Sequence, residues 1–93
     1  MILKEVVPSG TVGKQTFATT VKAILYGLHA SPSGANMTVK IRDGNASGDV
    51  VYFGKFLSAY GAKDVPFSNG IRFDKGMHVK VIGALGAAYL EIE

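Results

Sequence analysis

The sequence has no cysteine and no tryptophan. Without cysteine, the chain can form neither a disulfide nor a thiolate metal site. Its 93 residues make one small domain, and such a domain buries only about 60–65% of the surface that its unfolded chain exposes. Chains of this size commonly rely on a disulfide, a metal or a partner chain. We therefore expect a single domain, residues 1–93, that forms a homo-oligomer, with a trimer as one option.

Long apolar runs are also missing. The N-terminal segment 1–8 is too short for the apolar part of a signal peptide and has no small-residue cleavage site. No stretch approaches the ~20 apolar residues that span a bilayer. We therefore expect a protein that is made inside the cell and has no membrane partner.

What the chain has in excess is glycine, 12 of 93 residues, which favours a turn-rich β protein. The segment 37–42 places an apolar side chain at every second position, between two turn-forming stretches. This period of two predicts a strand with one buried face. The segments 77–82 and 88–92 show the same alternation. We expect Met37, Val39 and Ile41 to point into the core.

Further strands are expected elsewhere. The segment 2–7 is a terminal strand, and 16–29 is one bent strand or two. The β-branched and aromatic segment 50–56 predicts a strand with little solvent on either face. The segment 57–62 forms at most a helical turn, which Gly61 ends. The segment 83–86 reads as a hairpin connection between the last two strands.

These segments predict an all-β fold of about seven to nine strands, with turn signals every ~8–12 residues. The fold class we expect is a small antiparallel β-sandwich, jelly-roll-like, with an immunoglobulin-like strand order or a small barrel as alternatives. No crossover helix separates the strands, which excludes parallel βαβ units.

The sequence shows no catalytic constellation. Its two histidines, His29 and His78, have no carboxylate at a suggestive spacing, and no nucleophile elbow is present. The acidic residues lie in turn-rich segments or on the outward side of predicted strands. We therefore expect no enzyme activity, no catalytic residue and no cofactor.

One spacing resembles the opening of a calcium loop of the EF-hand type. Oxygen-bearing side chains occupy alternate positions, namely Asp43, Asn45, Ser47 and Asp49. The twelfth place, however, is Gly54 instead of the bidentate glutamate, and no helices flank the loop. We therefore expect a hairpin connection whose glycines supply the turn, and no metal, with calcium binding as the less favoured alternative.

The net charge is +3, and the lysines are spread along the sequence, whereas nucleic-acid binders concentrate theirs. Lys40 and Arg42 would form a basic patch with His78 and Lys80 if their strands were neighbours. We expect the aromatic residues to point mostly inward, which leaves few platforms for stacking on bases. We therefore do not expect a nucleic-acid partner.

Residues 21–93 resemble a known family in the order of their strand and turn motifs. An aromatic-glycine strand at 24–28 is followed by a strand that ends in Asp-Gly at 38–44, an Asn-Gly-Ile-x-Phe segment within 65–73 and a strand at 75–81. This is similar to small all-β, jelly-roll-like structural proteins of tailed bacteriophages, of the head decoration (cement) type. The resemblance implies a virion location after synthesis in the host cytoplasm, and a capsid or other virion protein as partner.

Two further expectations concern binding. The N-terminal strand, with Ile2, Leu3 and Val6, either pairs with the sheet edge of a neighbouring chain or is an internal strand of the same sandwich. The alternative function is a ligand- or carbohydrate-binding module of a phage tail or fibre. The lack of tryptophan counts against that module, and three tyrosines keep it open: Tyr52, Tyr60 and Tyr89.

Overall fold

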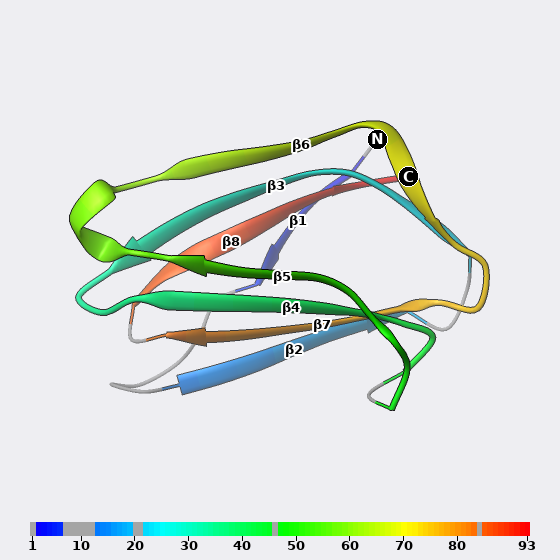
Figure 1. Cartoon of the computed structure of the whole chain (residues 1–93), viewed down its shortest axis with the longest axis horizontal. Coiled ribbons are helices and arrows are strands. Elements are labelled where there is room, and N and C mark those ends of the chain that lie inside the picture. The colour runs from blue at the N-terminus through cyan, green and yellow to red at the C-terminus, as the bar shows by residue number, and fades with distance from the viewer. Residues whose placement is uncertain (1, 7–12, 20–21, 46, 84) are drawn as a thin grey trace.

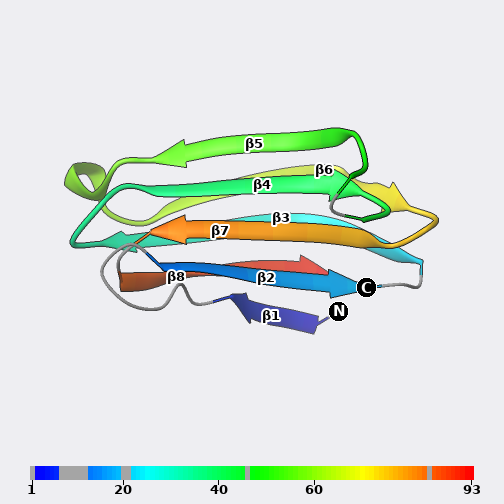
Figure 2. The same cartoon turned by 90° about the horizontal axis from the view of Figure 1, so that it is seen from below.

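The structure, a computed structural model, describes residues 2–6, 13–19, 22–45, 47–83 and 85–93. Within these ranges, eight strands form two four-stranded antiparallel sheets that face each other (Figures 1 and 2). The strands are β1 (Ile2–Val6), β2 (Gly13–Thr19), β3 (Ala23–Ser33), β4 (Met37–Asp43), β5 (Val50–Phe56), β6 (Lys63–Phe73), β7 (Met77–Gly83) and β8 (Leu85–Ile92). The prediction of a small antiparallel β-sandwich is confirmed.

The strand order is that of a jelly roll. One sheet has the order β1-β8-β3-β6, called here the β3 sheet, and the other has the order β2-β7-β4-β5, called here the β4 sheet. Each early strand pairs with a late one: β1 with β8, β2 with β7, β3 with β6 and β4 with β5. Rolling this long ribbon also brings β3 against β8 and β4 against β7, which produces the eight-stranded double Greek key.

The core lies between the two sheets, and alternation along each strand places its residues there. Val39 of β4 lies opposite Val81 of β7, and both are fully buried. The inward positions expected for β4 and β7 are confirmed, as are Ala88 and Leu90 of β8. The largest fully buried side chains are Phe73, Leu25, Leu28, Met37, Ile41, Met77, Leu90, Val39, Val79 and Val81.

Two segments expected to stay within one sheet or to leave the strand number open, 83–86 and 16–29, each join strands of different sheets. The segment 83–86 is not a hairpin connection, because β7 ends at Gly83 in the β4 sheet and β8 begins at Leu85 in the β3 sheet. The chain therefore crosses from one sheet to the other at this point. The segment 16–29 contributes to two strands, β2 and β3, which also lie in different sheets. Local alternation is the same before a hairpin and before a crossing, so it does not distinguish them.

The prediction that 50–56 is shielded on both faces is wrong. The strand β5 forms one end of the β4 sheet, and its side chains at Val50, Val51 and Phe53 are exposed. The expected helical turn is present as a short 3₁₀ helix, η1 (Ser58–Tyr60). Gly61 ends it in the left-handed region, at φ 72°, and its N–H donates to the carbonyl oxygen of Ser58.

Candidate functional site

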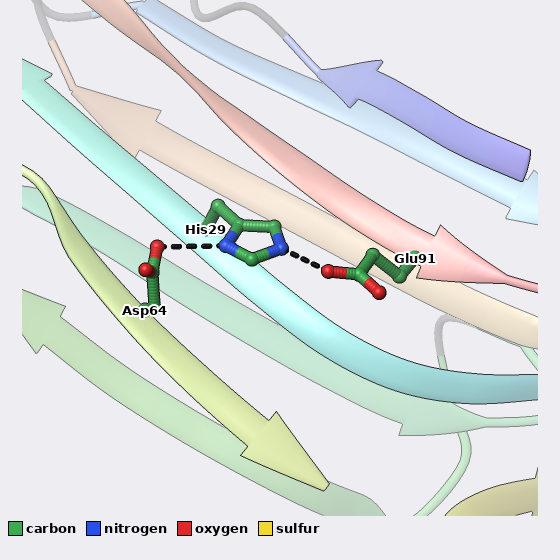
Figure 3. Close-up of polar contacts among 3 residues, drawn as sticks. All are labelled: His29, Asp64 and Glu91. Atoms are coloured by element: carbon green, nitrogen blue, oxygen red, sulfur yellow. Dashed lines mark hydrogen bonds and ion pairs between the residues drawn. The ribbon is translucent and has the colours of Figure 1, made fainter.

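A histidine between two carboxylates lies on the outer face of the β3 sheet (Figure 3). His29 of β3 has Asp64 of β6 as its register partner, and their Nδ1 and Oδ1 atoms are 2.7 Å apart. On the other side, its Nε2 is hydrogen bonded to Oε1 of Glu91 on β8. The imidazole thus connects the three neighbouring strands β6, β3 and β8.

The two carboxylates determine the charge of the histidine. Hydrogen bonds to Asp64 and then to Glu91 raise the pKa of His29 above its usual 6.5, with partial burial acting against them. To bond both carboxylates, each ring nitrogen must carry a proton, which makes the ring an imidazolium. A general base needs a ring nitrogen with a free lone pair. The arrangement therefore suits a structural link between neighbouring strands better than a catalytic base.

No carboxylate lies at a suggestive sequence spacing from His29, yet the fold places two beside it. Its partners lie 35 and 62 residues away in the sequence, so no local spacing reveals them. His78 does lie on the outward side of β7, half-buried, as expected. It faces Arg42 of β4 across the strand pair.

A backbone irregularity makes room for the Glu91 carboxylate. The pairing of β3 shifts its register between Leu25 and Gly27, and Gly27 then lies opposite Glu91. A Cβ atom at Gly27 would touch the Glu91 carboxyl carbon at 3.4 Å, so a larger side chain would take the space that the carboxylate uses to reach His29.

A second polar contact extends this arrangement to the end of the sheet. The Tyr89 hydroxyl of β8 donates to Oε2 of Glu5 on β1, at 2.9 Å. The same hydrogen bond is the main reason that the pKa of Tyr89 is raised. Side-chain contacts therefore run across all four strands of the β3 sheet, from β1 through β8 and β3 to β6.

The loop that resembles the opening of a calcium site is the connection of the β4–β5 hairpin, as expected. The N–H of Asp43 donates to the carbonyl of Asp49, and the Asn45 side-chain oxygen accepts the N–H of Ser47. Arg42 donates to the carbonyl of Gly48 at 2.8 Å. Among the described residues, no group of three or more His, Asp or Glu side chains is arranged so that it could hold a metal ion. Calcium binding by this loop stays an untested alternative.

Basic side chains gather on the outer face of the β4 sheet. Lys40 of β4 lies opposite Lys80 of β7, and the condition set by the sequence for a basic patch is met because β4 and β7 are neighbours. We call this surface the basic face; its residues are Lys40, Arg42, Lys55, His78 and Lys80. No outward position of β4, β5 or β7 that the structure describes carries an acidic residue.

The aromatic residues are less uniformly inward than expected. Phe53 is 57% exposed and Tyr60 is 81% exposed. The Lys40 ammonium group lies over the Phe53 ring, with its Nζ atom 5.6 Å from the ring centroid. Tyr52 does point inward and packs edge-on against Phe67 at 5.5 Å, and its burial raises its pKa.

Exposed apolar side chains lie at the start of β5, just after its end and on η1. We call this set the apolar edge; its residues are Val50, Val51, Leu57 and Tyr60. Beside it lies a surface hollow of about 410 Å³ whose lining includes Lys55, Leu57, Tyr60 and Lys63. This edge belongs to a strand at the end of its sheet, where backbone groups face outward as well.

The N-terminal strand pairs within its own chain. All five residues of β1 have partners on β8, and β1 forms one end of the β3 sheet. Leu3 points outward and is 60% exposed, whereas the side chains of Ile2 and Val6 lie outside the described residues. The segment is therefore a strand of its own sandwich, which was one of the two expectations. A role of Ile2, Leu3 and Val6 in contacting another chain stays a prediction.

No known protein-family model matches the chain, and no curated protein matches it either. None of the helices in the described ranges is long and apolar enough to cross a membrane.

Proposed function

We propose that this protein is a non-enzymatic structural component of a bacteriophage virion that decorates or stabilises the capsid through protein–protein contacts. The observation that carries the proposal is the apolar edge, where four large apolar side chains lie exposed along one strand and the helical turn after it. Exposed large apolar side chains on the end strand of a sheet are typical of a contact site for another protein.

The apolar edge suits docking in two ways. As an end strand, β5 offers its outer backbone groups for pairing with a strand of the partner. Val51 and Leu57 supply apolar area, and the neighbouring Lys55 and Lys63 form part of a polar rim. A partner that binds only the folded form also stabilises it, which suits a small chain without cysteine.

The sequence resemblance to phage decoration proteins and the jelly-roll strand order support the same proposal. Jelly rolls occur in viral capsid and lectin domains, but a fold alone does not define a function. The resemblance is therefore what directs the proposal to a virion, and the apolar edge is what directs it to docking.

Co-sedimentation with assembled phage heads tests this function. We expect the wild-type protein to sediment with heads and the double variant Val51→Lys with Leu57→Lys to stay in the supernatant, because two buried charges would disrupt an apolar contact. The control is Leu3→Lys, which places one charge on β1, an end strand of the other sheet. Loss of sedimentation in Leu3→Lys alone would move the docking site to β1 and contradict the role of the apolar edge.

A carbohydrate-binding module is the second candidate, and one observation favours it. Tyr60 is 81% exposed beside the hollow of about 410 Å³, where its ring is free to stack on a sugar. Tyr52 and Tyr89 are already engaged with Phe67 and Glu5. Binding of the protein to a glycan array that is lost in Tyr60→Ala, without association with heads, would favour this candidate over decoration.

A further inference from the structure

Lysines that lie far apart in the sequence meet on the basic face. Lys40 and Lys80 are direct register partners in the β4–β7 pair. Like charges directly opposite each other destabilise an antiparallel pair, so this pair costs the free protein stability unless an anion lies over it. Arg42 and His78 are the next outward pair along the same two strands, and Lys55 lies on the adjacent β5. The row thus offers several cations to one extended polyanion.

An exposed aromatic ring lies within this row of cations. Phe53 of β5 is the register partner of Lys40, and more than half of its side chain faces solvent. The Lys40 ammonium group lies 5.6 Å from the centre of its ring. Cations that follow a phosphate backbone beside an aromatic ring that stacks on a base are the components that single-strand binding proteins combine.

Acidic side chains distinguish the two outer faces. The outward positions of the β3 sheet include the acidic residues Glu5, Asp64 and Glu91, whereas the described outward positions of β4, β5 and β7 include none. With a sequence pI near 9.3, basic residues clustered on one face are the electrostatic signature of a nucleic-acid binder. Both sequence-based arguments against such a partner, dispersed lysines and inward aromatic rings, fail at this face.

We propose that the basic face binds single-stranded nucleic acid, with phosphates on Lys40, Lys80 and Lys55 and a base stacked on Phe53. A single strand fits better than a duplex, because its bases are free to reach an aromatic ring on an open sheet. Lysine ammonium groups and base stacking read no sequence, so binding is independent of sequence. This site shares Lys55 with the rim of the apolar edge, but its other residues lie on the outer face of the β4 sheet, and the proposal does not depend on the proposed capsid role.

The electrostatic part of the proposal has a quantitative consequence. Contacts with about three to four phosphates release that many counterions, which gives a slope of roughly −2 to −3 for the logarithm of the binding constant against the logarithm of the salt concentration. The affinity is therefore measurable at low salt and falls steeply toward physiological salt.

The test is fluorescence anisotropy of labelled oligothymidylate with the full chain. We expect the double variant Lys40→Glu with Lys80→Glu to lose at least ~10-fold in affinity and to reduce the salt slope. Phe53→Ala should lose ~5-fold or more through stacking alone, with the salt slope unchanged. The matched control is Lys63→Glu with Arg72→Glu, which changes the net charge equally but at exposed positions of β6, and it should keep wild-type affinity within about 2-fold. Circular dichroism establishes that each variant is folded.

Three results would overturn the proposal. Equal losses in both charge variants would show that net charge, and not the basic face, attracts the oligonucleotide. Equal binding to a duplex, with no effect of Phe53→Ala, would remove the stacking site. Binding to poly-L-glutamate without binding to oligothymidylate would identify an acidic protein as the occupant. Head co-sedimentation of Lys40→Glu with Lys80→Glu should equal that of the wild type, which keeps this result distinct from the test of the apolar edge.

Discussion

His29 illustrates how one residue connects three strands that are distant in the sequence. Its two ring nitrogens contact Asp64 and Glu91, whose own strands, β6 and β8, lie on either side of β3. The sequence around His29 indicates only a position on a strand and gives no sign of its two partners. The two partners became visible only when the jelly-roll pairing placed β6 and β8 beside it.

This cluster predicts a pH dependence of stability. The pKa of His29 is raised above 6.5 in the folded protein, first by its hydrogen bond to Asp64 and then by that to Glu91. A raised folded-state pKa contributes stability that is fully present below the unfolded-state value of about 6.5 and is lost as the pH rises through the folded-state pKa. We expect the urea midpoint to fall across that window above pH 6.5.

The variants His29→Gln and His78→Gln test whether His29 causes this pH dependence. His29→Gln should remove most of the change in urea midpoint with pH, whereas His78→Gln should retain it. A wild-type midpoint that stays constant from about pH 6 to pH 9 would show that the imidazolium adds nothing to stability.

At the scale of the element, the crossing from β7 to β8 depends on one glycine. Gly86 adopts φ 96° and lies opposite Pro32 of β3. A Cβ atom there would collide with the backbone carbonyl oxygen of Ser31. Residues other than glycine are strained at this φ, and a clash with backbone is not relieved by a change of rotamer.

We therefore expect Gly86→Ala to destabilise the fold by about 2–4 kcal/mol in urea unfolding, through strain and the clash together. The matched variant is Gly61→Ala, which has φ 72° but open space around its Cβ position. It should cost only about 1–2 kcal/mol. Equal losses in the two variants would show that the close approach to Ser31 has no energetic weight.

The strand β5 shows why composition alone misjudged an element. Valine and aromatic residues favour a strand, and β5 is one, but the same residues do not tell whether a neighbour covers its outer side. In the packed molecule β5 forms the end of its sheet, so Val50, Val51 and Phe53 face solvent. This exposure is the basis of the proposed docking edge and of the stacking site.

At the scale of the whole molecule, stability depends on the layer between the two sheets. Leu28 is fully buried there. We expect Leu28→Ala to cost about 2–5 kcal/mol, because it removes apolar area and leaves a cavity. That is a large fraction of the ~5–15 kcal/mol typical of a domain, so the urea midpoint should fall sharply or the protein should fail to fold.

Leu3→Ala is the comparison for this measurement. Leu3 is 60% exposed on β1, and its truncation should change the free energy of unfolding by no more than about 0.5 kcal/mol. A loss in Leu3→Ala that matches the loss in Leu28→Ala would mean that Leu3 is buried by an associated chain in solution. That result would support the predicted role of the N-terminal strand in contacting a neighbour.

Alternation in segments such as 37–42 and 77–82 was enough to predict the all-β sandwich and the inward faces of these strands, because the period of two is a local property of an extended chain. The order β1-β8-β3-β6 and β2-β7-β4-β5 was not predictable in this way. Strand neighbours are selected by the burial of the complete core, in which most contacts join residues distant in sequence. The His29 cluster and the basic face are both consequences of that order, so they exist only in the folded molecule.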